Sequence, residues 1–155
     1  IGPAQAARLK AALEIGKRLM SELPEDRWQI RSPGDAAHVL MPQLAHQPRE
    51  QLVILALDTR NRVIHQETLY SGTLNTSMVR IAEVFQVAIQ HNAAAVVIAH
   101  NHPSGDPNPS PEDVTLTRRL VKAGKLLEIN VLDHLVIGRN RYISLRERNL
   151  GFDEA

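Results

Sequence analysis

The sequence predicts a mixed α/β (α+β) fold in which one sheet is flanked by helices. Two observations lead to this prediction. The apolar run 93–99 is typical of a buried strand, and helical patterns precede and follow it. On either side of this helix–strand–helix centre lie pairs of strand-like segments joined by turns. The 155 residues are enough for one domain with its own hydrophobic core.

The chain is predicted to begin with a helical segment over residues 1–23. Apolar residues recur there about every 3.6 positions, and the other face is basic; the apolar positions are Ala4, Ala7, Ala11, Ile15 and Leu19. The polar stretch that follows predicts a linker at 24–32. The main domain is then expected over residues 33–150, and it opens with a helix that starts at Ser32-Pro33.

The remaining elements follow from periodicity and from turn residues. Ser110-Pro111-Glu112-Asp113 combines a capping serine, a proline at the first helical position and acidic residues in the first turn, so it predicts a helix start. That helix should end near Lys122, because Gly124 follows. The other elements expected after the second helix are strands at 51–57 and 62–70, a helix at 79–90, and strands at 93–99, 127–137 and 142–145.

Composition excludes several classes of site. The chain contains no cysteine, so disulfides and thiolate metal sites are excluded and any metal must be held by histidine and carboxylate. The net charge of +1 gives no electrostatic support for binding nucleic acid or an anionic membrane. No apolar run approaches the roughly 20 residues that span a bilayer. We therefore expect a cytoplasmic protein that does not insert into a membrane.

The residues that carry chemistry lie at the end of the central strand. His100 and His102 are two positions apart, and in extended backbone such residues point to the same side. Asp113 follows a loop with several prolines and could return a carboxylate to them. Three nitrogen and oxygen ligands with an open position are what a catalytic zinc site needs. The alternative for Ser110 and Asp113 is purely structural, as the N-cap and capping box of the following helix.

The pattern His100-x-His102-Pro103-x6-Ser110-x2-Asp113 resembles the motif of the JAMM (MPN-plus) metalloproteases. The string at residues 100–107 is similar to the bacterial RadC-like branch of that family, as are Leu132-Asp133-His134 and Ile137-Gly138. The resemblance covers about residues 32–150. It implies a cytidine-deaminase-like, MPN-type mixed sheet. Residues 1–7 resemble the second half of a helix-hairpin-helix, so the first helix is predicted to be a remnant of that motif.

The resemblance also implies a reaction, in which zinc on the two histidines and Asp113 activates water and polarises an amide carbonyl. Ser110 would donate its hydroxyl to the oxyanion that forms. Glu50 matches the position of the family's general acid–base glutamate, and Glu67 and Glu83 are the alternatives.

Asp133 and His134 interrupt an apolar strand. The sequence leaves them open as partners of a zinc histidine or as a structural pair.

Two functions from different classes follow. The first is a zinc-dependent peptidase or isopeptidase that acts on a peptide or protein. The second is a non-catalytic MPN-type binding module, or one associated with DNA repair. We expect DNA binding only through a part of the protein that precedes this chain. The ligand set with its serine favours the hydrolase, because a scaffold has no need of these residues together.

Overall fold

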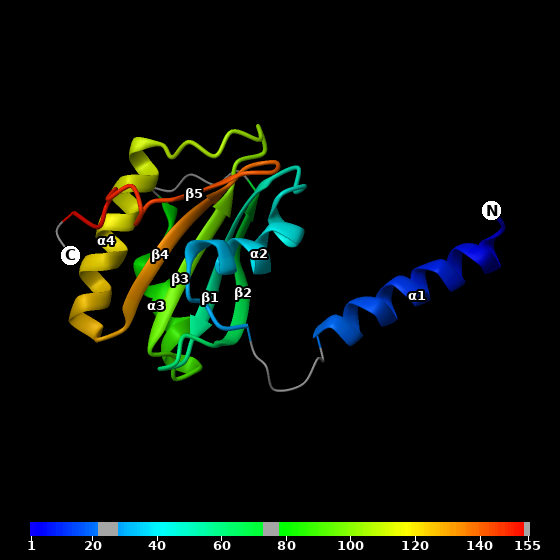
Figure 1. Ribbon diagram of the computed structural model, residues 1–155, viewed down its shortest axis with the longest axis horizontal. Helices are drawn as coiled ribbons and strands as arrows, with labels where there is room; N and C mark the ends of the chain where they lie inside the picture. Colours follow the sequence, from blue (N-terminus) through cyan, green and yellow to red (C-terminus); the bar gives the residue numbers. More distant parts are fainter. Residues whose placement is uncertain (22–27, 73–77, 154–155) are drawn as a thin grey trace.

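The sheet organises the fold. The computed structural model describes residues 1–21, 28–72 and 78–153. Five strands form one mixed sheet in the order β2-β1-β3-β4-β5 (Figure 1). Their bounds are β1 Glu50–Leu57, β2 Val63–Gly72, β3 Ala95–Asn101, β4 Asn130–Ile137 and β5 Tyr142–Ser144. The prediction of a mixed α/β fold with helices flanking one sheet is thereby confirmed.

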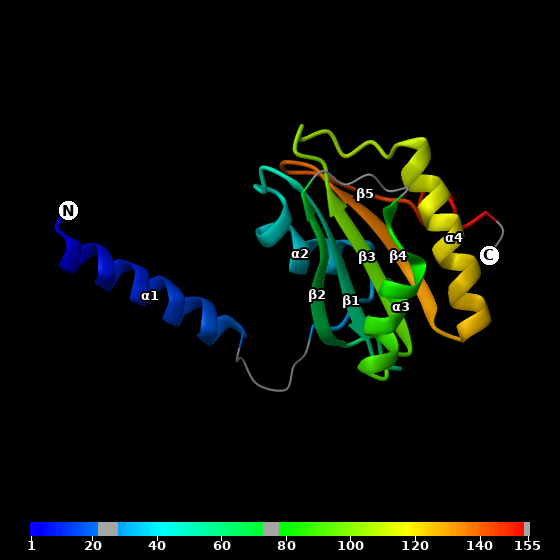
Figure 2. The same cartoon turned by 180° about the vertical axis from the view of Figure 1, so that it is seen from behind.

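Helices cover both faces of the sheet, which explains the continuous apolar runs in β1 and β3. Helices α3 (Ile81–Gln90) and α4 (Pro111–Leu127) cover one face, and α2 (Pro33–Leu44) covers the other (Figure 2). Side chains alternate between the two cores, as period-two strands require. In β1, Leu52 and Ile54 belong to the core under α3 and α4, whereas Val53 and Leu55 belong to the core under α2.

The register of the sheet brings three chain segments to one edge. β3 runs antiparallel to β1, with His100 opposite Leu52, and parallel to β4, with His100 opposite Val136. A parallel pair needs a crossover connection, and α4 supplies it between β3 and β4. The end of β3, the start of β1 and the first turn of α4 therefore lie close together.

The end of α4 corrects one prediction. The helix was expected to stop near Lys122, with a strand from Leu127, yet α4 continues to Leu127 and β4 begins only at Asn130. A Cβ on Gly124 would lie 2.5 Å from the Ile129 carbonyl oxygen. Gly124 therefore allows the helix to pack closely against the chain that follows it. The actual C-cap is Glu128, which adopts the left-handed conformation with φ of 56°.

The N-terminal helix α1 spans Pro3–Ser21. Residues 3–19 of this helix are exposed apart from the half-buried Gly16, so its apolar stripe has no covering partner in the part of the chain that the structure describes. Residues 22–27 lie outside the described residues. They include the end of the expected helical segment, at 22–23, and the first part of the expected linker, at 24–27. Ile30 is buried in the core under α2. Among the described residues, no helix combines the length and apolarity needed to cross a membrane.

Candidate metal centre

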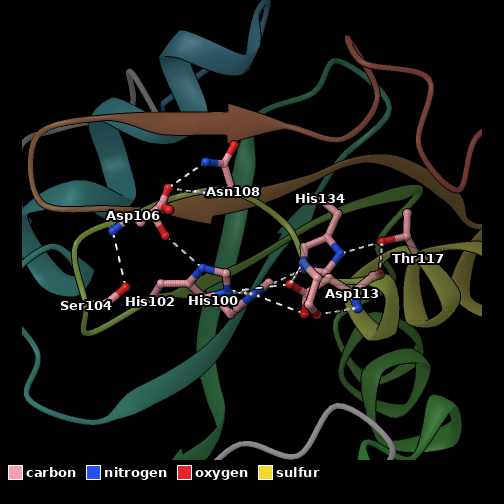
Figure 3. A network of polar contacts seen from close by, with 9 residues as sticks. His100, His102, Ser104, Asp106, Asn108, Asp113, Thr117 and His134 are labelled. Atoms are coloured by element: carbon pink, nitrogen blue, oxygen red, sulfur yellow. Dashed lines mark hydrogen bonds and ion pairs between the residues drawn. The ribbon is translucent and has the colours of Figure 1, made fainter.

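His100 and His102 converge at the end of β3. His100 is on the sheet face covered by α3 and α4 and is only 1% exposed. His102 lies just beyond the strand, where its amide donates to the Ile137 carbonyl and so extends the pairing with β4. The Nε2 atoms of the two rings are 3.1 Å apart. Figure 3 shows the two side chains side by side.

Asp113 reaches these rings from the first turn of α4. Ser110 is the N-cap, and its hydroxyl oxygen accepts from the Asp113 amide at 3.1 Å. In return, the Ser110 amide donates to Asp113 Oδ2 at 2.8 Å, which completes a capping box. The predicted capping role is present, and the cap also orients the carboxylate. Its Oδ1 lies 3.3 Å from His100 Nε2, and its Oδ2 lies 3.5 Å from His102 Nε2.

These separations suit a small tetrahedral cation. Ligand atoms bonded to zinc at about 2.0–2.1 Å in a tetrahedron lie roughly 3.3–3.5 Å from one another. The two histidine nitrogens are 3.1 Å apart, and each lies 3.3 or 3.5 Å from the nearer of the two Asp113 carboxylate oxygens, which is close to that range. Within the described part of the chain, His100, His102 and Asp113 are the group of histidine and carboxylate side chains whose ligand atoms lie close enough together to hold a metal ion.

The charges in the cluster favour an ionised carboxylate. Burial opposes ionisation of Asp113, but hydrogen bonds from His100 and His102 outweigh it and hold the pKa of Asp113 well below its usual value. The N-terminus of α4 supports the same negative charge. For His102, the contact with Asp113 raises the pKa against the effect of burial, and the nearby charge of Glu50 adds to the increase.

The loop after His102 is fastened to the turn between β4 and β5. His102 Nδ1 lies 2.9 Å from the Asp106 carbonyl oxygen, and both residues are labelled in Figure 3. The Gly105 amide donates to the His102 carbonyl. Across the turn, the Arg139 amide donates to the Gly105 carbonyl. A Cβ on Gly138 would lie 2.4 Å from that same carbonyl oxygen, so the close approach requires glycine.

His134 proves to be the neighbour of His100. The buried ring of His134 places Nε2 at 2.9 Å from His100 Nδ1 and Nδ1 at 2.6 Å from Thr117 Oγ1. Asp133 lies elsewhere, because its carboxylate accepts from the Ser144 hydroxyl and the Arg146 amide. The two side chains therefore have different partners, although Asp133 Oδ1 also accepts from the His134 amide at 2.7 Å. No sequence signal pointed to Thr117.

Glu50 begins β1 on the same side of the strand as Leu52, which pairs with His100. The buried Asn101 side chain holds this end of β1. Its Oδ1 accepts from the Gln51 amide at 2.7 Å, and its Nδ2 donates to the Arg49 carbonyl at 3.1 Å. Asn101 thus binds the backbone on both sides of Glu50, and no sequence pattern predicted this contact.

The two alternative glutamates have other partners. Glu67 contacts His65, with Oε1 3.2 Å from His65 Nε2. Glu83 is bound by the Tyr70 hydroxyl and by Arg80. Glu50, by contrast, lies at the start of β1, and its charge is the smallest of the influences that raise the pKa of His102.

Comparison with known proteins shows the family of this chain. Residues 30–150 match the family described as RadC-like JAB domain. A "UPF0758 protein" of Roseiflexus castenholzii is 56% identical over 152 residues, which cover 98% of this chain and 65% of that protein. A relative of the same name from Chloroflexus aggregans is 54% identical over 99% of this chain, and one from Desulforamulus reducens is 47% identical over 97%. The chain spans about two thirds of the length of these relatives, or 65–67%.

Proposed function

We propose that this chain, which belongs to the family of RadC-like JAB domains, is a zinc-dependent hydrolase of amide bonds, of the peptidase or isopeptidase type. One observation carries the proposal. Two histidine nitrogens and a carboxylate converge at separations of 3.1–3.5 Å, which suit a tetrahedral zinc ion and leave one coordination position for the reaction.

Each residue has a role that its position supports. His100, His102 and Asp113 would hold zinc, which when bound supplies a Lewis acid and activates water at neutral pH. Glu50 would take a proton from the attacking water and return it to the leaving nitrogen, since the ligands are committed to the metal. The Ser110 hydroxyl oxygen accepts from the Asp113 amide, which leaves its proton free to stabilise the oxyanion.

The proposed base requires a fixed position. A general base acts only within hydrogen-bonding reach of its proton, directly or through one water. Asn101 supplies that constraint by binding the backbone at Arg49 and Gln51, on both sides of Glu50.

Metal content tests the ligand set. Purified protein at neutral pH should bind one zinc ion per chain, measured by elemental analysis and by calorimetric titration. His102→Ala should release it. His46→Ala, which alters an exposed histidine outside the cluster, should keep it. Full occupancy in the His102 variant would remove this assignment.

Hydrolysis can be tested without a known substrate. The zinc-loaded protein is incubated with a cell-derived mixture of peptides and proteins, and an amine-reactive label reveals newly formed α- and ε-amines by mass spectrometry. Glu50→Gln should keep zinc and abolish the new amines, because an amide cannot carry the proton. Glu67→Gln and Glu83→Gln are the matched controls and should remain active. If only one of the control variants loses activity, the glutamate changed in that variant is the general base. If wild-type protein produces no new amines, the proposed hydrolysis is wrong.

A further inference from the structure

We propose that Thr117 and His134 are positioning residues that fix which ring nitrogen of His100 is offered to the metal. They do so through one directed chain of hydrogen bonds, visible in Figure 3, that ends at the backbone of Asp113. The inference rests on the proposed function, because it concerns the same metal centre.

The direction of the chain is set at Thr117. Its Oγ1 lies 2.7 Å from the Asp113 carbonyl oxygen and 2.6 Å from His134 Nδ1. A carbonyl oxygen carries no proton, so the Thr117 hydroxyl must donate its single hydrogen there. The hydroxyl oxygen can then only accept from the ring, and His134 Nδ1 must carry a proton.

The second step is the state of His134. This ring is fully buried, and its two hydrogen-bonding partners are the Thr117 hydroxyl and the His100 ring, neither of which carries a negative charge, so the neutral ring is the form that fits this site. A neutral imidazole protonated on Nδ1 has a bare Nε2 that accepts a hydrogen bond. His100 Nδ1, 2.9 Å away, is the donor.

The third step follows for His100 itself. Because Nδ1 donates its proton to His134, Nε2 is the His100 nitrogen that is left to bind the metal. That nitrogen faces His102 Nε2 at 3.1 Å and Asp113 Oδ1 at 3.3 Å, where the metal would lie. The chain of hydrogen bonds ends at the backbone carbonyl of Asp113, so it connects the His100 ring to the helical turn that carries the third ligand.

His102 needs no such chain, because its Nδ1 lies against the Asp106 carbonyl, which can only accept. Histidine ligands usually donate their second nitrogen to a carbonyl or a carboxylate. His100 instead meets another histidine, which could accept or donate. The Thr117 hydroxyl is what removes this ambiguity.

Long-range ¹H–¹⁵N correlation spectra of the zinc-free full chain report the tautomer of each ring. Both His100 and His134 should carry their protons on Nδ1. A proton on Nε2 of His134 would overturn the proposal, whether or not zinc binds. Failure of wild-type protein to bind zinc would instead refute the proposed function and leave the tautomer result to stand by itself.

Variants then link the tautomer to metal binding. Thr117→Val removes the hydroxyl at nearly constant volume and should weaken zinc binding about 10–100-fold, the usual effect of losing an outer partner of a ligand. Thr117→Ser should restore affinity. Thr115→Val is the control. The Thr115 hydroxyl donates to the Pro111 carbonyl four residues earlier, just as the Thr117 hydroxyl donates to the Asp113 carbonyl, but Thr115 is exposed.

Calorimetric zinc titration and the ring spectra are recorded for all three variants. The proposal is supported if Thr117→Val alone loses affinity and redistributes the ring protons. Wild-type affinity and unchanged tautomers in Thr117→Val would refute it. If Thr117→Val does not fold, the wild-type spectra and the Thr117→Ser titration decide.

Discussion

Gly138→Ala should damage the metal centre from outside it. Gly138 lies in the turn between β4 and β5, against the loop that carries His102. An added Cβ would lie 2.4 Å from the Gly105 carbonyl oxygen and 3.0 Å from Pro107 Cδ. Ordinary contact begins at 3.4 Å, so the loop backbone must move by about 1 Å. A shift of this size is enough to break the 2.9 Å contact between His102 Nδ1 and the Asp106 carbonyl.

Two effects of measurable size follow. Overpacking of this kind costs about 1–3 kcal/mol of unfolding free energy. At about 2–4 °C per kcal/mol for a chain of this length, Tm should fall by roughly 2–12 °C. Loss of the partner that orients His102 should also weaken zinc binding about 10–100-fold. Thermal unfolding of the zinc-free protein and calorimetric zinc titration measure the two effects separately.

Gly124→Ala separates local damage from general instability. Its Cβ would lie 2.5 Å from the Ile129 carbonyl oxygen, a clash similar to that at Gly138 but at the far end of α4. Both variants should lose stability, and only Gly138→Ala should lose zinc affinity. Equal zinc affinity in the two variants would refute the argument that the turn positions His102.

Two further predictions concern the cap and the start of β1. Ser110→Ala should lower the unfolding free energy by about 0.5–2 kcal/mol, because the side-chain cap is lost. Zinc should stay bound, because the backbone amide of residue 110 still donates to Asp113 Oδ2. Turnover should fall roughly 100-fold or more, whereas loss of a purely capping serine would leave turnover per folded molecule unchanged. Asn101→Leu should remove the side-chain partners of the Gln51 amide and the Arg49 carbonyl. The unfolding free energy should fall by about 1–3 kcal/mol, and hydrogen exchange of the Gln51 amide should become faster. An unchanged exchange rate at Gln51 would show that Asn101 does not hold this end of β1.

The sequence by itself determined the parts of the molecule that depend on neighbouring residues. Two histidines at i and i+2 share a side in any extended chain, and the structure brings them together with Asp113. The Ser110-x2-Asp113 spacing is that of a capping box, which forms within a single helical turn. The uninterrupted apolar run before His100 predicted a strand buried on both faces, and β3 is such a strand.

Local pattern was misleading where a residue serves a distant contact. Gly124 suggested the end of a helix, yet its lack of a side chain serves the approach of the chain after α4. Asn101 lies between the two histidines and carries no local signal, because its partners are backbone atoms of Gln51 in β1 and of Arg49 just before it, 50 and 52 residues away.

Only the tertiary structure decided which residue meets His100. The register of β3 and β4 shifts by one residue, so Val96 pairs with Val131 but Val97 pairs with Asp133. A shift of one residue moves the following side chains to the opposite face of a sheet. His134 therefore pairs with Ile98 and lies on the metal side, whereas Asp133 turns toward Ser144. Such a shift depends on how two strands fit against their helices, and no periodicity within one strand encodes it.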